Sequence, residues 1–172
     1  MTILQTPSTR APISPNLLRP GLTLLVGDSA FCERPIITTA VMIHHGVPPL
    51  KASKRVFVAT DCEYMTHARI DATEERLGLP PSKMHNRLWS CAFYNPFTEG
   101  DFFREMARRT NSDYVFLTQP LPKDREGQAA AFAMLKRLSA EAPWAAIVAH
   151  TRRIQLTVPE LGATRVSRRG SR

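Results

Sequence analysis

The stretch 20–46 constrains the fold more than any other part of the chain, because it is typical of a strand, a connection and a helix in succession. Residues 23–26 form an apolar, β-favouring run that a glycine and an aspartate close, and this predicts a buried strand. Pro35 stands where the first residue of a helix would be, and Gly46 is placed for the helix C-cap. The pattern therefore predicts a loop at 27–34 between a strand and a buried helix.

The predicted loop has the length of a phosphate-binding P-loop, G-x-x-x-x-G-K-[ST], but lacks its chemistry. In a P-loop, the lysine ammonium meets the phosphates and the hydroxyl holds Mg²⁺. Here Glu33 takes the lysine position, so the attraction between lysine and phosphate is replaced by a repulsion between two negative charges. Each of these interactions is worth about 4 kcal/mol for one close charge pair near a protein surface. Arg34 is the cation that could replace the lysine. The candidate nucleotide-binding residues are Gly27, Asp28, Ser29, Ala30, Phe31, Cys32, Glu33 and Arg34.

Predicted strands and helices alternate along the rest of the chain. The strands are expected at 56–60, 88–93, 113–118 and 145–149, and the helices at about 64–77, 99–109 and 126–140. Regular alternation of this kind indicates a parallel sheet with right-handed crossovers, and hence an α/β fold. After residue 153 we expect one hairpin.

The chain has 172 residues, of which 43% are hydrophobic, and this is enough for one domain with a buried core. Residues 1–19, rich in proline, are expected to be flexible or draped over the surface, residues 20–158 to form the domain, and residues 159–172 to form a basic tail. No apolar run reaches the roughly 18 residues of a membrane-spanning helix, and residues 1–15 lack the features of a signal peptide. We therefore expect a cytoplasmic protein without a membrane partner.

Cysteines and histidines predict no metal site. The three cysteines, Cys32, Cys62 and Cys91, have the spacing of neither a disulfide framework nor a zinc site, so we expect reduced thiols. Cys32 could alternatively be a reactive thiol, because it lies near a predicted helix N-terminus and beside an arginine. His44 and His45 are adjacent on a predicted helix and point to different faces, which argues against a shared metal ion.

The formal net charge of +8 predicts an anionic partner, and nucleic acid is the commonest one in the cytoplasm. Arginines near the C-terminus suit contacts to a phosphate backbone without readout of bases. A solvated basic tail is the alternative. The candidate nucleic-acid contacts are Arg152, Arg153, Arg168 and Arg169.

With its elements in this order, the chain resembles the RecA-like P-loop ATPases, most closely the branch that includes RepA-type hexameric replicative helicases. The resemblance spans residues 17–153 and rests on four stretches: LLRPGLTLLVGDSA, RVFVATDCEYMTHARIDATEERLGL, DYVFLTQPL and AAAFAMLKRLSAEAPWAAIVAHTRR. They are similar to the family's P-loop strand, its second strand and helix, its Walker B strand, and its sensor strand. The resemblance implies a three-layer RecA-like domain with a mainly parallel sheet flanked by helices.

The resemblance also implies roles for single residues. Asp61 and Glu63 match the general base that activates water, and His150 matches the sensor of the γ-phosphate. Thr118 stands where the Walker B aspartate would orient Mg²⁺, so ATP and Mg²⁺ lack their usual protein contacts. As alternatives, Asp61 and Glu63 would cap the following helix, and His150 would be a polar strand-end residue without a role in chemistry.

We therefore expect a hydrolysis-deficient RecA/RepA-like module that binds DNA or a partner in replication, recombination or repair. A homo- or hetero-oligomer with RecA-like subunits would fit this function. An active helicase-type ATPase that uses Arg34 or Lys51 for phosphate, and Asp61 or Glu63 for metal and water, is one alternative. A regulatory, protein-binding pseudo-ATPase is another.

Overall fold

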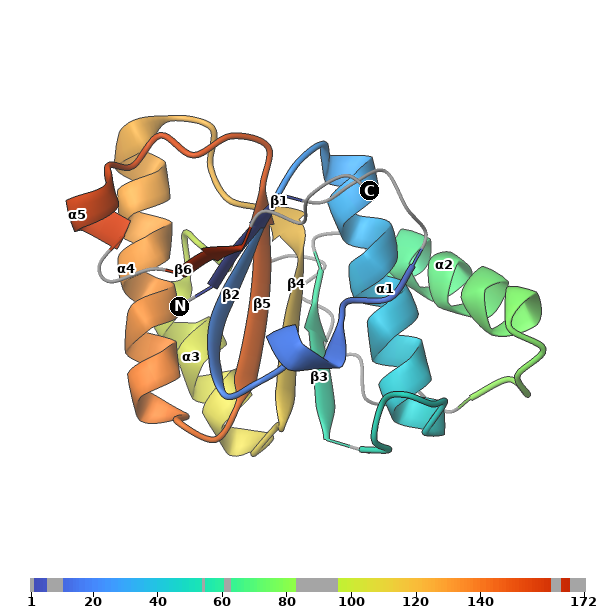
Figure 1. The fold of residues 1–172 in the computed structure, drawn as a ribbon. Helices are drawn as coiled ribbons and strands as arrows, with labels where there is room; N and C mark the ends of the chain where they lie inside the picture. The colour runs from blue at the N-terminus through green and yellow to red at the C-terminus, as the bar shows by residue number, and fades with distance from the viewer. Residues whose placement is uncertain are drawn as a thin grey trace.

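Parallel strands form a single sheet in the computed structural model, which describes residues 2–5, 11–53, 55–60, 63–82, 96–161 and 165–167. Within these residues the sheet has six strands in the order β3-β4-β5-β2-β1-β6, and every neighbouring pair is parallel (Figure 1). The strands are β1 (Thr2–Gln5), β2 (Gly21–Val26), β3 (Val56–Ala59), β4 (Tyr114–Pro120), β5 (Ala146–Thr151) and β6 (Arg165–Ser167).

Helices cover both faces of this sheet (Figure 1). They are α1 (Ser29–His45), α2 (Glu63–Arg76), α3 (Gly100–Arg109), α4 (Arg125–Glu141) and α5 (Val158–Leu161), with a short 3-10 helix at Pro15–Leu17. Because successive side chains of a strand point to opposite faces, neighbouring residues of one strand enter different cores. Phe116 packs with α1 and α2, whereas Val115 and Leu117 pack with α3 and α4. The α/β fold with a parallel sheet, predicted from the alternation, is confirmed, and so are the helical layers on both faces that the resemblance implies.

Most predicted elements lie within a few residues of the observed ones, and the exceptions concern a predicted strand, the N-terminal segment, the C-terminal hairpin and the end of the domain. The strand predicted at 88–93 lies outside the described residues. Residues 2–5 of the segment 1–19 form β1, which pairs with β2 inside the sheet, so the expectation that this segment is flexible or draped over the surface is wrong for these residues. The expected C-terminal hairpin is also wrong, because α5 is followed by β6, which pairs in parallel with β1. A domain boundary at residue 158 would cut through α5.

The loop predicted at 27–34 is much shorter in the structure. Helix α1 begins at Ser29, and the Asp28 carbonyl accepts the N–H of Cys32 at 3.0 Å, which closes the first helical turn. Pro35 therefore lies inside the helix, where its missing N–H costs one backbone hydrogen bond. Only Gly27 and Asp28 connect β2 to α1.

No helix in the described part of the chain is both long and apolar enough to cross a membrane.

Candidate functional site

The carboxyl ends of β4, β5 and β2 lie side by side at the top of the sheet in Figure 1. After β2 the chain passes into α1 on one face, and after β5 it continues to α5 on the opposite face. In open α/β sheets, ligands bind outside the carboxyl ends of strands at such a reversal. The fold alone therefore indicates where a ligand site would lie.

A pocket of about 560 Å³ occupies this position. Its lining includes Asp28 from the β2–α1 connection, Lys123 from the segment after β4, and Thr151, Arg152 and Arg153 from the end of β5. Lys123, Arg152 and Arg153 are exposed, so three cations and one carboxylate border the opening. We call this pocket the carboxyl-edge pocket, and its excess of positive charge suits an anionic ligand.

A buried glutamine holds the wall of the carboxyl-edge pocket in place. Gln128 of α4 is only 1% exposed, and its Nε2 donates to the carbonyl oxygens of Pro122 at 3.2 Å and Arg153 at 3.0 Å, and lies 3.2 Å from Thr151 Oγ1. Its Oε1 accepts the backbone N–H of Gln155 at 2.7 Å. One side chain thus ties the segment after β4 to the segment after β5 and fixes the backbone that carries two arginines of the pocket.

Gln128 is not among the residues predicted from the sequence, although its position on α4 carries a signal. It shares one face of α4 with Ala131, Leu135 and Leu138, all of which are buried. A polar residue on an apolar helical face is expected to have buried hydrogen-bond partners. The signal identifies a structural clamp but not what it clamps.

A carboxylate anchors the start of α5 on α4. Glu160 accepts both the N–H and the hydroxyl of Thr157 at 2.7 Å, and the guanidinium of Arg125 at 2.9 Å. The backbone N–H of Thr157, then its hydroxyl and Arg125, lower the pKa of Glu160 to about 2. This carboxylate is therefore ionised at neutral pH and helps to hold the segment that follows the pocket.

His150, the predicted sensor, is fully buried in β5. Its Nε2 lies 2.7 Å from the carbonyl oxygen of Thr118, and because a carbonyl only accepts, Nε2 carries the proton. The register of β4 on β5 is irregular between Phe116 and Pro120, so the imidazole fills a gap in the strand ladder. The structure brings His150 and Thr118 together as a strand-bridging pair, and neither residue is among those that line the carboxyl-edge pocket.

Thr118, at the predicted Walker B position, is also committed to the sheet. Its hydroxyl donates to the carbonyl oxygen of Ala59 on β3 at 3.1 Å, and the residue is 5% exposed. The hydroxyl therefore links β4 to β3. It does not face a metal site, and within the described residues no group of three histidine, cysteine, aspartate or glutamate side chains is placed to hold a metal ion.

The candidate nucleotide-binding residues are dispersed. Of those whose side chains the structure describes, only Asp28 lines the carboxyl-edge pocket. The Gly27 N–H donates to the Thr151 carbonyl at 3.0 Å and extends the β2–β5 ladder. Cys32 is a fully buried free thiol in the core, which supports its reading as a small apolar residue. Glu33 forms an ion pair with Arg69 of α2. The remaining members are Ser29, Ala30 and Phe31 in the first turn of α1, and Arg34, which faces α2.

Four further predicted residues are placed only in part or not at all. Glu63 is the first residue of α2, as the helix-capping alternative requires, but its side chain is not described. Asp61, Arg168 and Arg169 lie outside the described residues. Arg152 and Arg153 do border the carboxyl-edge pocket, so the structure unites two of the four proposed nucleic-acid contacts with a cavity.

The described residues do not fit the ATP and Mg²⁺ site of a P-loop ATPase. The lysine position holds a carboxylate that is paired with Arg69, and the Walker B position holds a hydroxyl that is bonded to Ala59. A connection of two residues also leaves no loop to wrap around a phosphate.

The sequence matches no family model and no curated protein.

Proposed function

We propose that the chain is a RecA/RepA-like domain that does not hydrolyse ATP and that binds DNA as an accessory module in replication, recombination or repair. The observation that carries this proposal is the carboxyl-edge pocket, where Lys123, Arg152 and Arg153 border the opening. The pocket lies where the connections after β2 and β5 pass to opposite faces of the sheet. The ordered resemblance over residues 17–153 supports the superfamily, and the α/β architecture is compatible with it.

The loss of hydrolysis is proposed from two positions. Glu33 is paired with Arg69, and its carboxylate would repel a phosphate in the place of the lysine. The Thr118 hydroxyl donates to a backbone carbonyl and lacks the charge that orients Mg²⁺.

A phosphate backbone is the anion that the pocket favours. Its three cations are exposed on flexible side chains, as phosphate contacts require, and among the described residues that line it none is aromatic. Binding of this kind depends on charge and falls with salt.

The test is fluorescence anisotropy of labelled single-stranded DNA with the full chain across a salt series. Replacing both arginines, Arg152→Gln with Arg153→Gln, is expected to weaken binding and to lower the salt slope by about 1.4 if each contacts one phosphate. The matched control is Arg108→Gln with Arg109→Gln, two exposed arginines on α3 that pair with Glu105. DNA binding that survives the first double variant, or that both double variants weaken equally, contradicts the proposal.

A nucleotide is the second candidate ligand, because Asp28 leads into the N-terminus of the 17-residue helix α1 beside the same pocket. Backbone N–H groups at a helix N-terminus attract phosphate. The active helicase-type ATPase expected as an alternative would use Arg34 or Lys51 for phosphate, but Arg34 lines a different cavity, and Lys51 follows the far end of α1, about 25 Å along the helix axis. Calorimetric titration with ATP, with and without Mg²⁺, separates the cases: a regulatory, protein-binding pseudo-ATPase would bind neither ATP nor DNA.

A further inference from the structure

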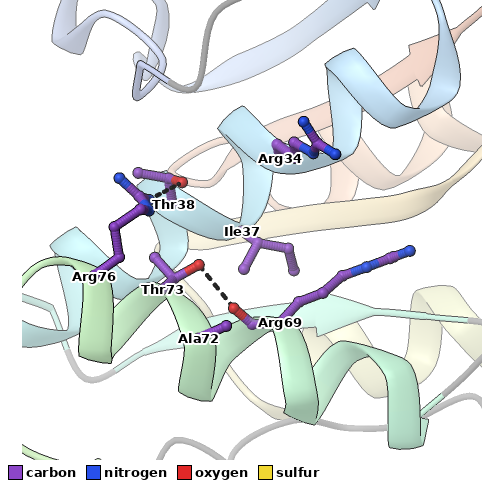
Figure 2. A pocket seen from close by; sticks show the side chains of 7 residues that line it. All are labelled: Arg34, Ile37, Thr38, Arg69, Ala72, Thr73 and Arg76. Carbon is purple, nitrogen blue, oxygen red and sulfur yellow. Dashed lines mark hydrogen bonds between the residues drawn. The ribbon is translucent and has the colours of Figure 1, made fainter.

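A second cavity, of about 360 Å³, lies between helices α1 and α2 (Figure 2). Three arginines surround it, Arg34 from α1 and Arg69 and Arg76 from α2. Ile37 and Ala72 give its floor an aliphatic character. We call this cavity the arginine groove. It shares no lining residue with the carboxyl-edge pocket.

The arginine groove carries an excess of positive charge. Arg69 pairs with the Glu33 carboxylate, and Arg76 Nη2 donates to the Thr38 hydroxyl at 3.1 Å. Arg34 is exposed and makes no hydrogen bond or ion pair among the described residues. The groove therefore holds three guanidinium groups and one carboxylate. A second anion could pair with Arg34, which has no ion-pair partner among the described residues, and with Arg76, whose partner is a neutral hydroxyl.

The spacing of the arginines favours a particular kind of anion. Arg69 and Arg76 are seven residues apart on α2, which is two turns, or about 10.5 Å. The two side chains point toward opposite ends of the groove (Figure 2). Carboxylates two turns apart on a partner helix, on side chains that spread in the same way, would reach one guanidinium each. Thr73 donates its hydroxyl to the Arg69 carbonyl at 2.7 Å, so this stretch of α2 has a defined shape (Figure 2).

We infer that the arginine groove binds an acidic segment of a partner protein, with small apolar side chains over Ile37 and Ala72. Guanidinium groups bind carboxylates through paired hydrogen bonds, and recognition of acidic motifs by arginine clusters is a recurring mode. Glu33 already places one carboxylate against Arg69, so the groove accepts this chemistry. A nucleic acid is less well matched, because the described lining of the groove holds the aliphatic side chains of Ile37 and Ala72 and no aromatic ring on which a base could stack. The inference does not rest on the proposed function.

The test uses the full chain and a labelled helical peptide of alanine and leucine with glutamates seven residues apart, beside the same peptide with glutamines. The glutamate peptide is expected to bind at least tenfold more tightly. The triple variant Arg34→Gln, Arg69→Gln, Arg76→Gln is expected to lose roughly tenfold to a hundredfold in affinity, because each of three exposed pairs contributes about twofold to fivefold.

A matched triple variant controls for net charge. Arg108, Arg109 and Arg137 are exposed on α3 and α4, which cover the opposite face of the sheet, and their change to glutamine should leave affinity within about twofold. Because Arg69 and Arg76 have partners within the fold, Ala72→Glu is the second test variant: it keeps every arginine and places a competing carboxylate in the groove, and it should also weaken binding about tenfold. Circular dichroism establishes that each variant is folded.

Three results would overturn the inference: equal binding of the two peptides, equal losses from the two triple variants, or full affinity in folded Ala72→Glu. A different result would assign the groove to nucleic acid instead: single-stranded DNA binds more tightly than the glutamate peptide, and only the groove variants lose this DNA binding.

Discussion

Replacing Gln128 by alanine removes the clamp between the segments after β4 and β5 without changing any charge. The side chain is 1% exposed and has four polar partners within 3.2 Å. A net hydrogen bond contributes about 1 kcal/mol, and a buried group left without a partner costs about 1–3 kcal/mol. In the variant, water can hydrogen-bond to some of the backbone groups that Gln128 leaves without a partner, which reduces the cost. We therefore expect Gln128→Ala to lower the free energy of unfolding by about 2–4 kcal/mol.

Chemical unfolding in urea, followed by circular dichroism, measures this loss. Gln155→Ala is the matched control, because Gln155 is exposed and contributes only its backbone N–H to the clamp, so its change should stay within about 0.5 kcal/mol. The same clamp positions the backbone of Arg153, so Gln128→Ala should also weaken anion binding at the carboxyl-edge pocket.

Gln128→Glu separates hydrogen bonding from shape. The carboxylate would still accept the Gln155 N–H but would face the carbonyls of Pro122 and Arg153 with no proton to donate. Burial beside these oxygens raises the pKa of such a carboxyl in the folded state, so the stability of the variant relative to the parent should improve as the pH falls. A cost below 1 kcal/mol for Gln128→Ala, or a Gln128→Glu variant as stable as the parent at pH 7, would refute this account of the clamp.

Three further predictions concern the fold. Burial raises the pKa of Glu74, but hydrogen bonds from His45 and Ser82 outweigh it and lower that pKa below its usual 4.5. Glu74→Gln should therefore lower the free energy of unfolding, measured by thermal unfolding at pH 7, by about 1–3 kcal/mol. The difference from the parent should shrink as the pH falls below 4.5, and a difference that does not change with pH would contradict this prediction. Leu135→Ala, at a fully buried position against β-strand side chains, should cost about 2–5 kcal/mol in urea unfolding. Thr118→Val should cost about 1 kcal/mol and leave DNA affinity unchanged, whereas a loss of DNA affinity would show that its hydroxyl serves the site.

The central strands and the long helices are predictable because their own side chains determine them. Apolar runs such as 113–118 and helical faces such as Ala131, Leu135 and Leu138 bury their residues in any parallel α/β sheet. The strands β1 and β6 have only four and three residues. Their short sequences carry little signal, and pairing with distant parts of the chain decides their structure.

The candidate site is less predictable than the fold. Pro35 favours a helix start at its own position, but the helix begins six residues earlier, and this turns Glu33 and Arg34 toward α2. The hydroxyl of Thr118 and the imidazole of His150 are hydrogen-bonded to backbone carbonyls of neighbouring strands. No local sequence pattern indicates these hydrogen bonds. What the sequence does predict is the cationic pair Arg152 and Arg153 at a strand end, which is where parallel sheets bind ligands.

The most direct test of the central claim is a steady-state ATPase assay on the full chain with Mg²⁺, with and without single-stranded DNA, run beside DNA binding on the same preparation. The account predicts no ATP turnover above the protein-free rate, together with DNA binding that weakens steeply with salt. ATP turnover that DNA stimulates and that Glu63→Gln or His150→Ala abolishes in a folded variant would contradict it.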